Sequence, residues 1–171
     1  IDEITTPLDN FTYFLGSEYS TVDTIEYYID ELDDYYDVPI EPITLQSNEI
    51  LLTKYNGTSK DVVVPDTYTV GDTTYNVVVL SWVYLCYYDE ANGIDIDNDD
   101  GVFEYNTNIE SVFLGNNVKF MYNNGSEVIE NSMGNLFSGC TSLVNAPVIP
   151  SSVTDMGFTF SSCTSLINAP E

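Results

Sequence analysis

The amino-acid sequence predicts an α+β repeat solenoid with a parallel sheet, capped at its N-terminus by a segment that contains a helix and a hairpin. The first observation is a duplication, because FSGCTSLVNAP starts at Phe137 and FSSCTSLINAP starts at Phe160, 23 residues later. A fixed period of about 23 residues is typical of solenoids, whose units are stabilised by stacking on their neighbours. Apolar runs before the duplication fit the same period, whereas the first 42 residues do not.

The composition indicates a folded and strongly acidic protein. The 171 residues include 28 Asp and Glu but only three Lys and Arg, which gives a formal charge of −25 at pH 7. This charge disfavours nucleic acid and anionic lipid as partners. Strong acidity alone would favour disorder, but 14 Tyr, 8 Phe and 43% hydrophobic residues favour a packed core. No apolar run approaches roughly 18 residues, so we expect no direct membrane insertion.

Residues 1–42 are predicted to form an acidic cap of helical and extended structure. Ser20 to Asp23 is typical of a helix start, because such side chains accept hydrogen bonds from the first free N–H groups. An apolar stripe follows with the periodicity of one helix face: Val22, Ile25, Ile29, Leu32 and Tyr36. Acidic residues crowd the end of this expected helix, either as a solvated face or as a site for a cation or a basic partner.

Residues 43–171 are predicted to form the repeat array. A hairpin over 43–55 leads into parallel strands near 62–64, 112–114, 146–148 and 168–170. Measured against the repeat, the array carries insertions at about 86–108 and 122–132, and inserted loops often carry function in repeat proteins. The sequence stops midway through a repeat. We therefore expect an open C-terminal coil, which continues into further repeats or associates end to end with a second molecule.

The unit from Leu143 to Ser165 carries a recognisable order of residues: Leu143, Ala146, Val148, Pro150, Val153, Met156, Phe160 and Cys163. It resembles the BspA-type leucine-rich repeat of bacterial surface proteins, with one extra residue, Ile149, before the proline. The preceding unit matches less closely, because Gly115 replaces the proline. The resemblance implies a secreted or wall-attached bacterial protein, located outside the cell or on its surface, with any signal peptide removed or outside this segment.

Outward-facing positions of the expected sheet suggest a ligand-binding surface. Side chains alternate along a strand, so the residue between the last two inward positions of each repeat faces outward. These residues are Val63, Phe113, Pro147 and Pro170. An apolar outward row on the sheet of a solenoid is a plausible ligand groove. Packing against another domain or cover by the N-terminal segment is the alternative.

The first insertion contains a possible cation site. Asp95, Asp97 and Asp99 alternate and Glu104 follows, which suggests an oxygen-rich loop that could hold Ca²⁺. The EF-hand pattern fails, because Asp100 stands where glycine is required and Gly101 comes one residue late. A solvated acidic turn without a metal is the alternative.

Catalytic and cofactor motifs are not apparent in the sequence. It has no His, no GxSxG and no glycine-rich phosphate loop, so we expect neither an enzyme nor a cofactor. Of the three cysteines, Cys140 and Cys163 share one repeat position and should stack in successive coils. They are either free core thiols or a disulfide, and Cys86 is left over.

Two functions are compatible with these features. The first is a surface module for adhesion, which binds a protein or glycan ligand on host, matrix or other cells through the sheet face or the inserted acidic loop. The second is a structural spacer of a larger bacterial surface protein, with no ligand of its own. The outward apolar row favours the first.

Overall fold

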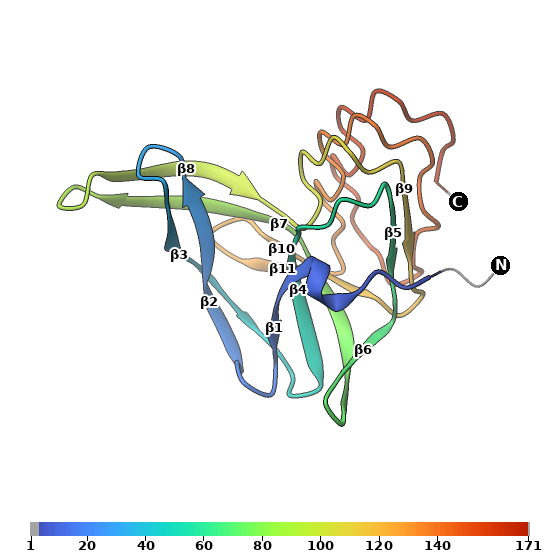
Figure 1. Cartoon of the computed structure of the whole chain (residues 1–171), viewed down its shortest axis with the longest axis horizontal. Helices are drawn as coiled ribbons and strands as arrows, with labels where there is room; N and C mark the ends of the chain where they lie inside the picture. Colours follow the sequence, from blue (N-terminus) through green and yellow to red (C-terminus); the bar gives the residue numbers. More distant parts are fainter. Residues whose placement is uncertain (1–3, 171) are drawn as a thin grey trace.

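The structure is a computed structural model that describes residues 4–170, and these residues are nearly all sheet (Figure 1). The only helical element within them is the single 3₁₀ turn η1 (Leu8–Asn10). The strands are β1 (Phe11–Leu15), β2 (Thr21–Ile29), β3 (Asp34–Thr44), β4 (Glu49–Tyr55), β5 (Asp61–Val64), β6 (Thr67–Val70), β7 (Thr73–Asp89), β8 (Ile94–Asp100), β9 (Ser111–Leu114), β10 (Lys119–Asn123) and β11 (Val128–Glu130). The predicted α+β solenoid with a capping helix is therefore wrong as a description of the fold.

A mixed seven-stranded sheet forms the centre of the molecule. Its main path runs β1-β4-β7-β10-β11, with β6 and β8 pairing to the two ends of β7. The pairs β4-β7 and β7-β10 are parallel, whereas β1-β4, β10-β11, β6-β7 and β7-β8 are antiparallel. Two smaller sheets, β2-β3 and β5-β9, complete the fold.

Two hydrophobic cores share the central sheet because its strands present apolar side chains on both faces. Val77 and Val79 belong to the core on the side of β5 and β9. Val78 and Leu80, the alternate residues of β7, belong to the core under the β2-β3 hairpin. Residues on both sides of position 42 contribute to each core. The division of the chain at that position stays a prediction.

The helix expected after Ser20 is replaced by the β2-β3 hairpin. A bulge between Val22 and Thr24 separates the buried Val22 and Ile25 by three residues, which imitates the start of a helical stripe. The chain turns at residues 30–33, where Leu32 is 48% exposed. Strand-favouring residues such as Thr24, Ile25 and Tyr27 suit a sheet better than a helix. The acidic residues thus surround a hairpin turn and are not at a helix end.

The hairpin expected over 43–55 is also wrong, although the chain does turn at Ser47 and Asn48. Its first half belongs to β3, which pairs with β2. Its second half is β4, which lies between β1 and β7 in the central sheet. Both faces of β4 are buried, so its near-continuous apolar run reflects a central strand.

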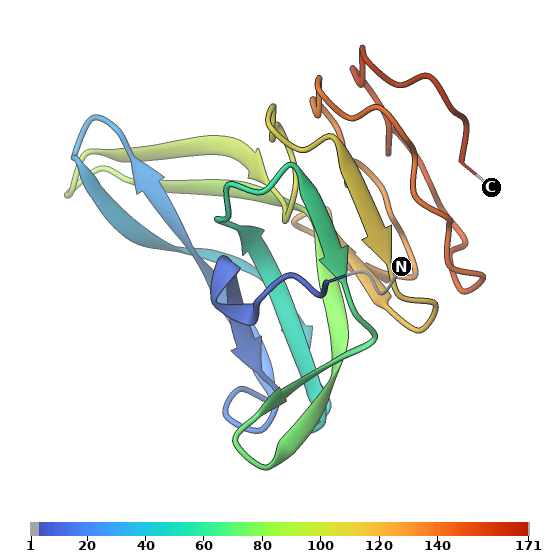
Figure 2. The same cartoon turned by 45° about the vertical axis from the view of Figure 1, so that its right-hand side comes forward.

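The two copies of the repeat form stacked turns of chain, which we call rungs, and they lie beside β5 and β9 in Figure 2. Phe137 stacks on Phe160 with ring centroids 5.6 Å apart. Asn145 forms parallel bridges with both Ser111 and Asn168. However, only β5 and β9 pair as strands here, and the strands expected at 146–148 and 168–170 are absent from the described residues. The rungs do not close into a regular solenoid.

Both expected insertions correspond to antiparallel hairpins that extend the central sheet. The β7-β8 hairpin ends where the Val102 N–H donates to the Leu80 carbonyl, and the β10-β11 hairpin ends where Asn131 donates to Phe120. Phe103 stacks on Phe137 with ring centroids 5.7 Å apart, so Phe103 is the repeat equivalent of Phe137, whereas an insertion that begins at about residue 86 would give that place to Leu85. The first insertion therefore begins near Ser81, earlier than expected.

Candidate binding surfaces

An apolar groove with a volume of about 760 Å³ opens beside the β5-β9 pair. It is lined by the N-terminal stretch 4–7, by β5 and β9, and by residues 146–148. Val63, Phe113 and Pro147, three of the four residues predicted to bind ligand, are among its lining residues. Pro170, the fourth, is not.

Strand alternation explains how Val63 and Phe113 come to the groove. Their neighbours Val62, Val64, Val112 and Leu114 are buried in the core. The intervening side chains therefore point the other way, and Phe113 is 45% exposed. Val63 and Phe113 are direct partners in the parallel β5-β9 ladder, so they lie side by side on the groove floor.

Pro147 differs from the prediction because it is buried, whereas Val148 is 56% exposed. This part of the rung is not a strand and bridges its neighbours only through Asn145. Strict alternation consequently does not apply to it. Pro147 contributes to the lining from a buried position, and Val148 supplies the exposed apolar surface that Pro147 was expected to provide.

The N-terminal wall of the groove is hydrogen-bonded to the edge of β5. The Thr6 N–H donates to the Val63 carbonyl at 3.1 Å, and the Val63 N–H donates to Thr6 Oγ1 at 2.8 Å. The Tyr68 hydroxyl donates to the Thr6 carbonyl. The chain itself therefore occupies this strand edge, and a ligand would contact side chains and not add a strand there.

The margin of the groove is polar and acidic. Among the described lining residues, Asp61 is the one with a charged side chain, and it accepts a hydrogen bond from Ser111 Oγ at 2.6 Å. Nearby, Lys60 forms an exposed ion pair with Glu110 at 2.9 Å. An apolar floor beside an acidic margin suits a ligand with apolar side chains and positive charge.

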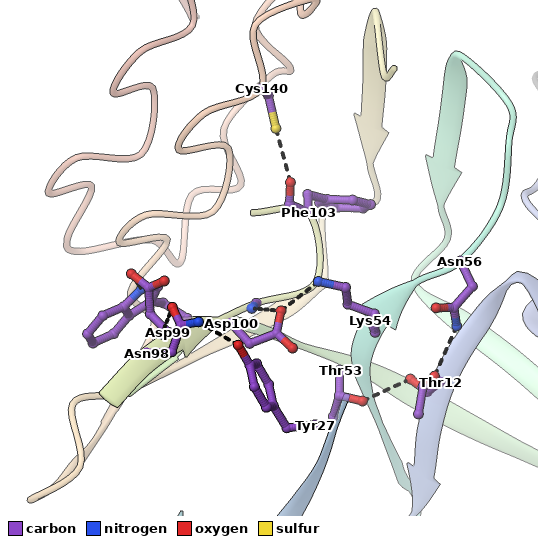
Figure 3. Close-up of polar contacts among 12 residues, drawn as sticks. Thr12, Tyr27, Thr53, Lys54, Asn56, Asn98, Asp99, Asp100, Phe103 and Cys140 are labelled. Atoms are coloured by element: carbon purple, nitrogen blue, oxygen red, sulfur yellow. Dashed lines mark hydrogen bonds and ion pairs between the residues drawn. The ribbon is translucent and has the colours of Figure 1, made fainter. Parts of the chain in front are cut away.

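The acidic segment expected to be a loop is instead strand β8. Ile94 and Ile96 are buried in the core, so Asp95 and Asp97 point away from it. The carboxylates of Asp97 and Asp99 meet different neighbours: the Tyr84 hydroxyl donates to Asp97 at 2.5 Å and Trp82 Nε1 donates to Asp99 at 3.2 Å. Asp100 lies against Lys54 at 2.6 Å (Figure 3). Within the described residues, no three Asp, Glu or Cys side chains gather closely enough to hold a metal.

Glu104, directly after the β7-β8 hairpin, is a buried carboxyl group that the sequence did not single out for burial. Its side chain is 6% exposed, and its Oε2 atom is buried without a hydrogen-bond partner. Burial, assisted by the charge of Asp99, raises the pKa of Glu104 to about 8. An alignment of the repeats on Phe103 would have located Glu104 in the fold, because Glu104 follows Phe103 as Ser138 follows Phe137.

The cysteines are free thiols, which agrees with one of the two alternatives for Cys140 and Cys163. Cys140 is buried and donates to the Phe103 carbonyl at 3.1 Å (Figure 3). Cys163 makes the equivalent bond to Phe137 at 3.2 Å. Burial raises the pKa of the Cys140 thiol to about 12, so it is a poor nucleophile at neutral pH. Cys86 is exposed.

No protein-family model matches the chain, and no curated protein sequence matches it. The chain is similar to the crystal structure of a leucine rich cell surface protein from Faecalibacterium prausnitzii A2-165, with 20% identity and a TM-score of 0.42. The similarity covers 83% of this chain but 29% of that one. A likeness this distant assigns neither a family nor an activity, and the BspA-type assignment stays a proposal.

Among residues 4–170, no helix has the length and apolar character needed to cross a membrane.

Proposed function

We propose that this chain is a non-enzymatic binding module of a bacterial surface protein, and that it holds an apolar segment of a protein ligand in the groove beside β5 and β9. The observation that carries the proposal is the convergence of Val63, Phe113 and Pro147 on one groove of about 760 Å³. Large exposed apolar side chains grouped in a concave surface are typical of interaction sites.

A protein ligand fits the groove better than a glycan does. Val63, Phe113, Ala146, Pro147 and Val148 supply mainly aliphatic surface, with Phe113 as the one aromatic ring of the lining. Of the hydrogen-bonding side chains among the described lining residues, Thr6, Ser59, Asp61 and Ser111 are already hydrogen-bonded within the chain, which leaves Thr5 and Asn10 for sugar hydroxyl groups. The acidic margin at Asp61 adds a preference for ligands with a neighbouring positive charge.

The test is binding of the purified chain to immobilised extracellular-matrix proteins and to intact cells of other bacteria. We expect Phe113→Ala to weaken saturable binding at least tenfold, as for a central apolar contact. Phe158→Ala is the matched control, because Phe158 is 76% exposed and lies outside the groove lining. Equal binding by wild type and Phe113→Ala would contradict the groove. Failure of the wild type to bind any of these surfaces would favour the spacer function.

A further inference from the structure

A second surface, distinct from the groove, combines aromatic rings and carboxylates where the β7-β8 hairpin leaves the central sheet. Trp82 stacks between Tyr84 and Tyr122, with ring centroids 6.2 Å and 5.0 Å away. Trp82 Nε1 also donates to Asp99. We call the set Trp82, Tyr84, Tyr122, Asp99 and Glu104 the aromatic-acidic surface. None of its members lines the groove.

The base of this surface contains an unsatisfied acceptor. Glu104 Oε2 is buried without a hydrogen-bond partner, and, after burial, the charge of Asp99 is one of the causes that raise the pKa of Glu104. Two ionised carboxylates can only accept hydrogen bonds, so the pair needs either a shared proton or a positive group. Leaving a charged acceptor unsatisfied costs more free energy than leaving a neutral one unsatisfied. The site is therefore incomplete when both carboxyl groups are ionised.

Among residues 4–170, no lysine is free to complete the pair. The three basic residues of the chain are Lys54, Lys60 and Lys119, and each is already within ion-pair distance of another acid. Lys54 Nζ lies 2.6 Å from Oδ1 of Asp100, the residue that follows Asp99 in β8. A positive group must then come from a proton or from another molecule.

We propose that Glu104 and Asp99, beside the Trp82 ring, bind the guanidinium group of an arginine in a basic peptide segment of a partner. Two carboxylates without a third do not make a metal site, and no three-ligand group exists among the described residues. A guanidinium group presents its N–H donors in a planar fork, so it can donate to two carboxylates at the same time. The net charge of −25 attracts such a segment from a distance.

Other titratable groups face this pair and belong to the same electrostatic unit. Asp99 and Asp100 approach from β8, and Trp82 approaches from β7. The charge of Glu104 also contributes to raising the pKa values of Tyr105, Tyr122 and Cys140. These phenols and the thiol are neutral near pH 8, so an incoming guanidinium group competes mainly with the proton on Glu104.

Trp82 is the only tryptophan, so its fluorescence reports directly on this surface. The probe is an acetylated and amidated hexapeptide with two arginines, compared with the same peptide carrying citrulline. We expect a saturable change with the arginine peptide only, and at least tenfold weaker binding by Glu104→Gln and by Asp99→Asn. Asp95→Asn is the charge-matched control, because Asp95 lies exposed further along β8, and its affinity should stay within twofold.

The pH dependence separates a specific site from general attraction. With a pKa of about 8, the ionised fraction of Glu104 rises roughly tenfold between pH 7 and pH 9, whereas arginine stays charged throughout. Affinity for the arginine peptide should rise to a similar extent in the wild type and stay flat in Glu104→Gln. Equal weakening by Asp95→Asn and Glu104→Gln, no saturable signal, or a flat wild-type profile would each overturn the proposal. Phe113→Ala should bind the peptide normally, which keeps this result independent of the groove.

Discussion

Glu104 links the free energy of unfolding to pH. Burial and the charges of Asp99 and Asp100 raise its pKa from the ordinary value of 4.5 to about 8. Between these two values the folded chain retains a proton that the unfolded chain releases. The stability associated with protonated Glu104 is therefore fully present below about pH 4.5 and is lost as the pH rises to about 8.

Replacement of Glu104 by glutamine should remove this dependence. At pH 9 we expect Glu104→Gln to be more stable than the wild type by about 1–3 kcal/mol, because the variant no longer buries an unpartnered charge. The difference should shrink toward pH 5, where the wild-type side chain is protonated. Urea unfolding at pH 5, 7 and 9 measures it, with Asp95→Asn as an exposed control. A difference that stays constant across the three pH values would contradict the raised pKa.

At the level of single residues, strand alternation predicted which side chains face outward only where the rung forms a strand. Val63 and Phe113 lie in the groove as their strand positions required. Pro147 does not follow the same alternation, because its rung is not a strand. Insertion bounds of about 86–108 place Glu104 in a possible cation-binding loop, whereas the stacking of Phe103 on Phe137 places it beside the core.

At the level of elements, the β2-β3 hairpin and the helix expected in its place lead to opposite predictions for the burial of Leu32. A helix would bury Leu32 in its apolar stripe, whereas the hairpin leaves it 48% exposed at the turn. Ile43, at the other end of β3, is completely buried in the core under the hairpin. We expect Ile43→Ala to lower the free energy of unfolding by about 2–5 kcal/mol. Leu32→Ala should change it by no more than about 0.5 kcal/mol.

Denaturant titration of the two variants at one pH distinguishes the hairpin from the helix. Comparable losses for Leu32→Ala and Ile43→Ala would favour the helix. The sequence alone could not decide, because a bulge between Val22 and Thr24 gave a strand the three-residue spacing of a helical face. Local strand propensity at Thr24 and Tyr27 was the signal that favoured the sheet.

The architecture of the whole molecule depends on pairings that have no local signal. The 23-residue duplication predicted which rungs stack, and Phe137 and Phe160 do so. Nothing local specifies that β7 pairs in parallel with both β4 and β10, since these contacts join segments far apart in the sequence. The central sheet and its two cores therefore emerge only from long-range packing, and a regular solenoid was the wrong extrapolation.

The charge of the whole molecule leads to a last prediction. A net charge of −25 on 171 residues opposes the compact state through self-repulsion, and salt screens exposed charges over about 10 Å at 0.1 M. Only three ion pairs occur among residues 4–170. The exposed pair Lys60–Glu110 contributes about 0–1 kcal/mol, and the other two have shielded acids that salt screens less, so the weakening of ion pairs by salt is the smaller effect. We expect the melting temperature at pH 7 to rise by several degrees between 10 mM and 300 mM NaCl.

Sucrose, which leaves charge unscreened, is the solute control. A variant with Asp30, Asp34 and Asp37 changed to asparagine should show a shallower dependence of the melting temperature on salt. A melting temperature that falls or stays constant with salt would mean that self-repulsion does not limit the stability of this fold.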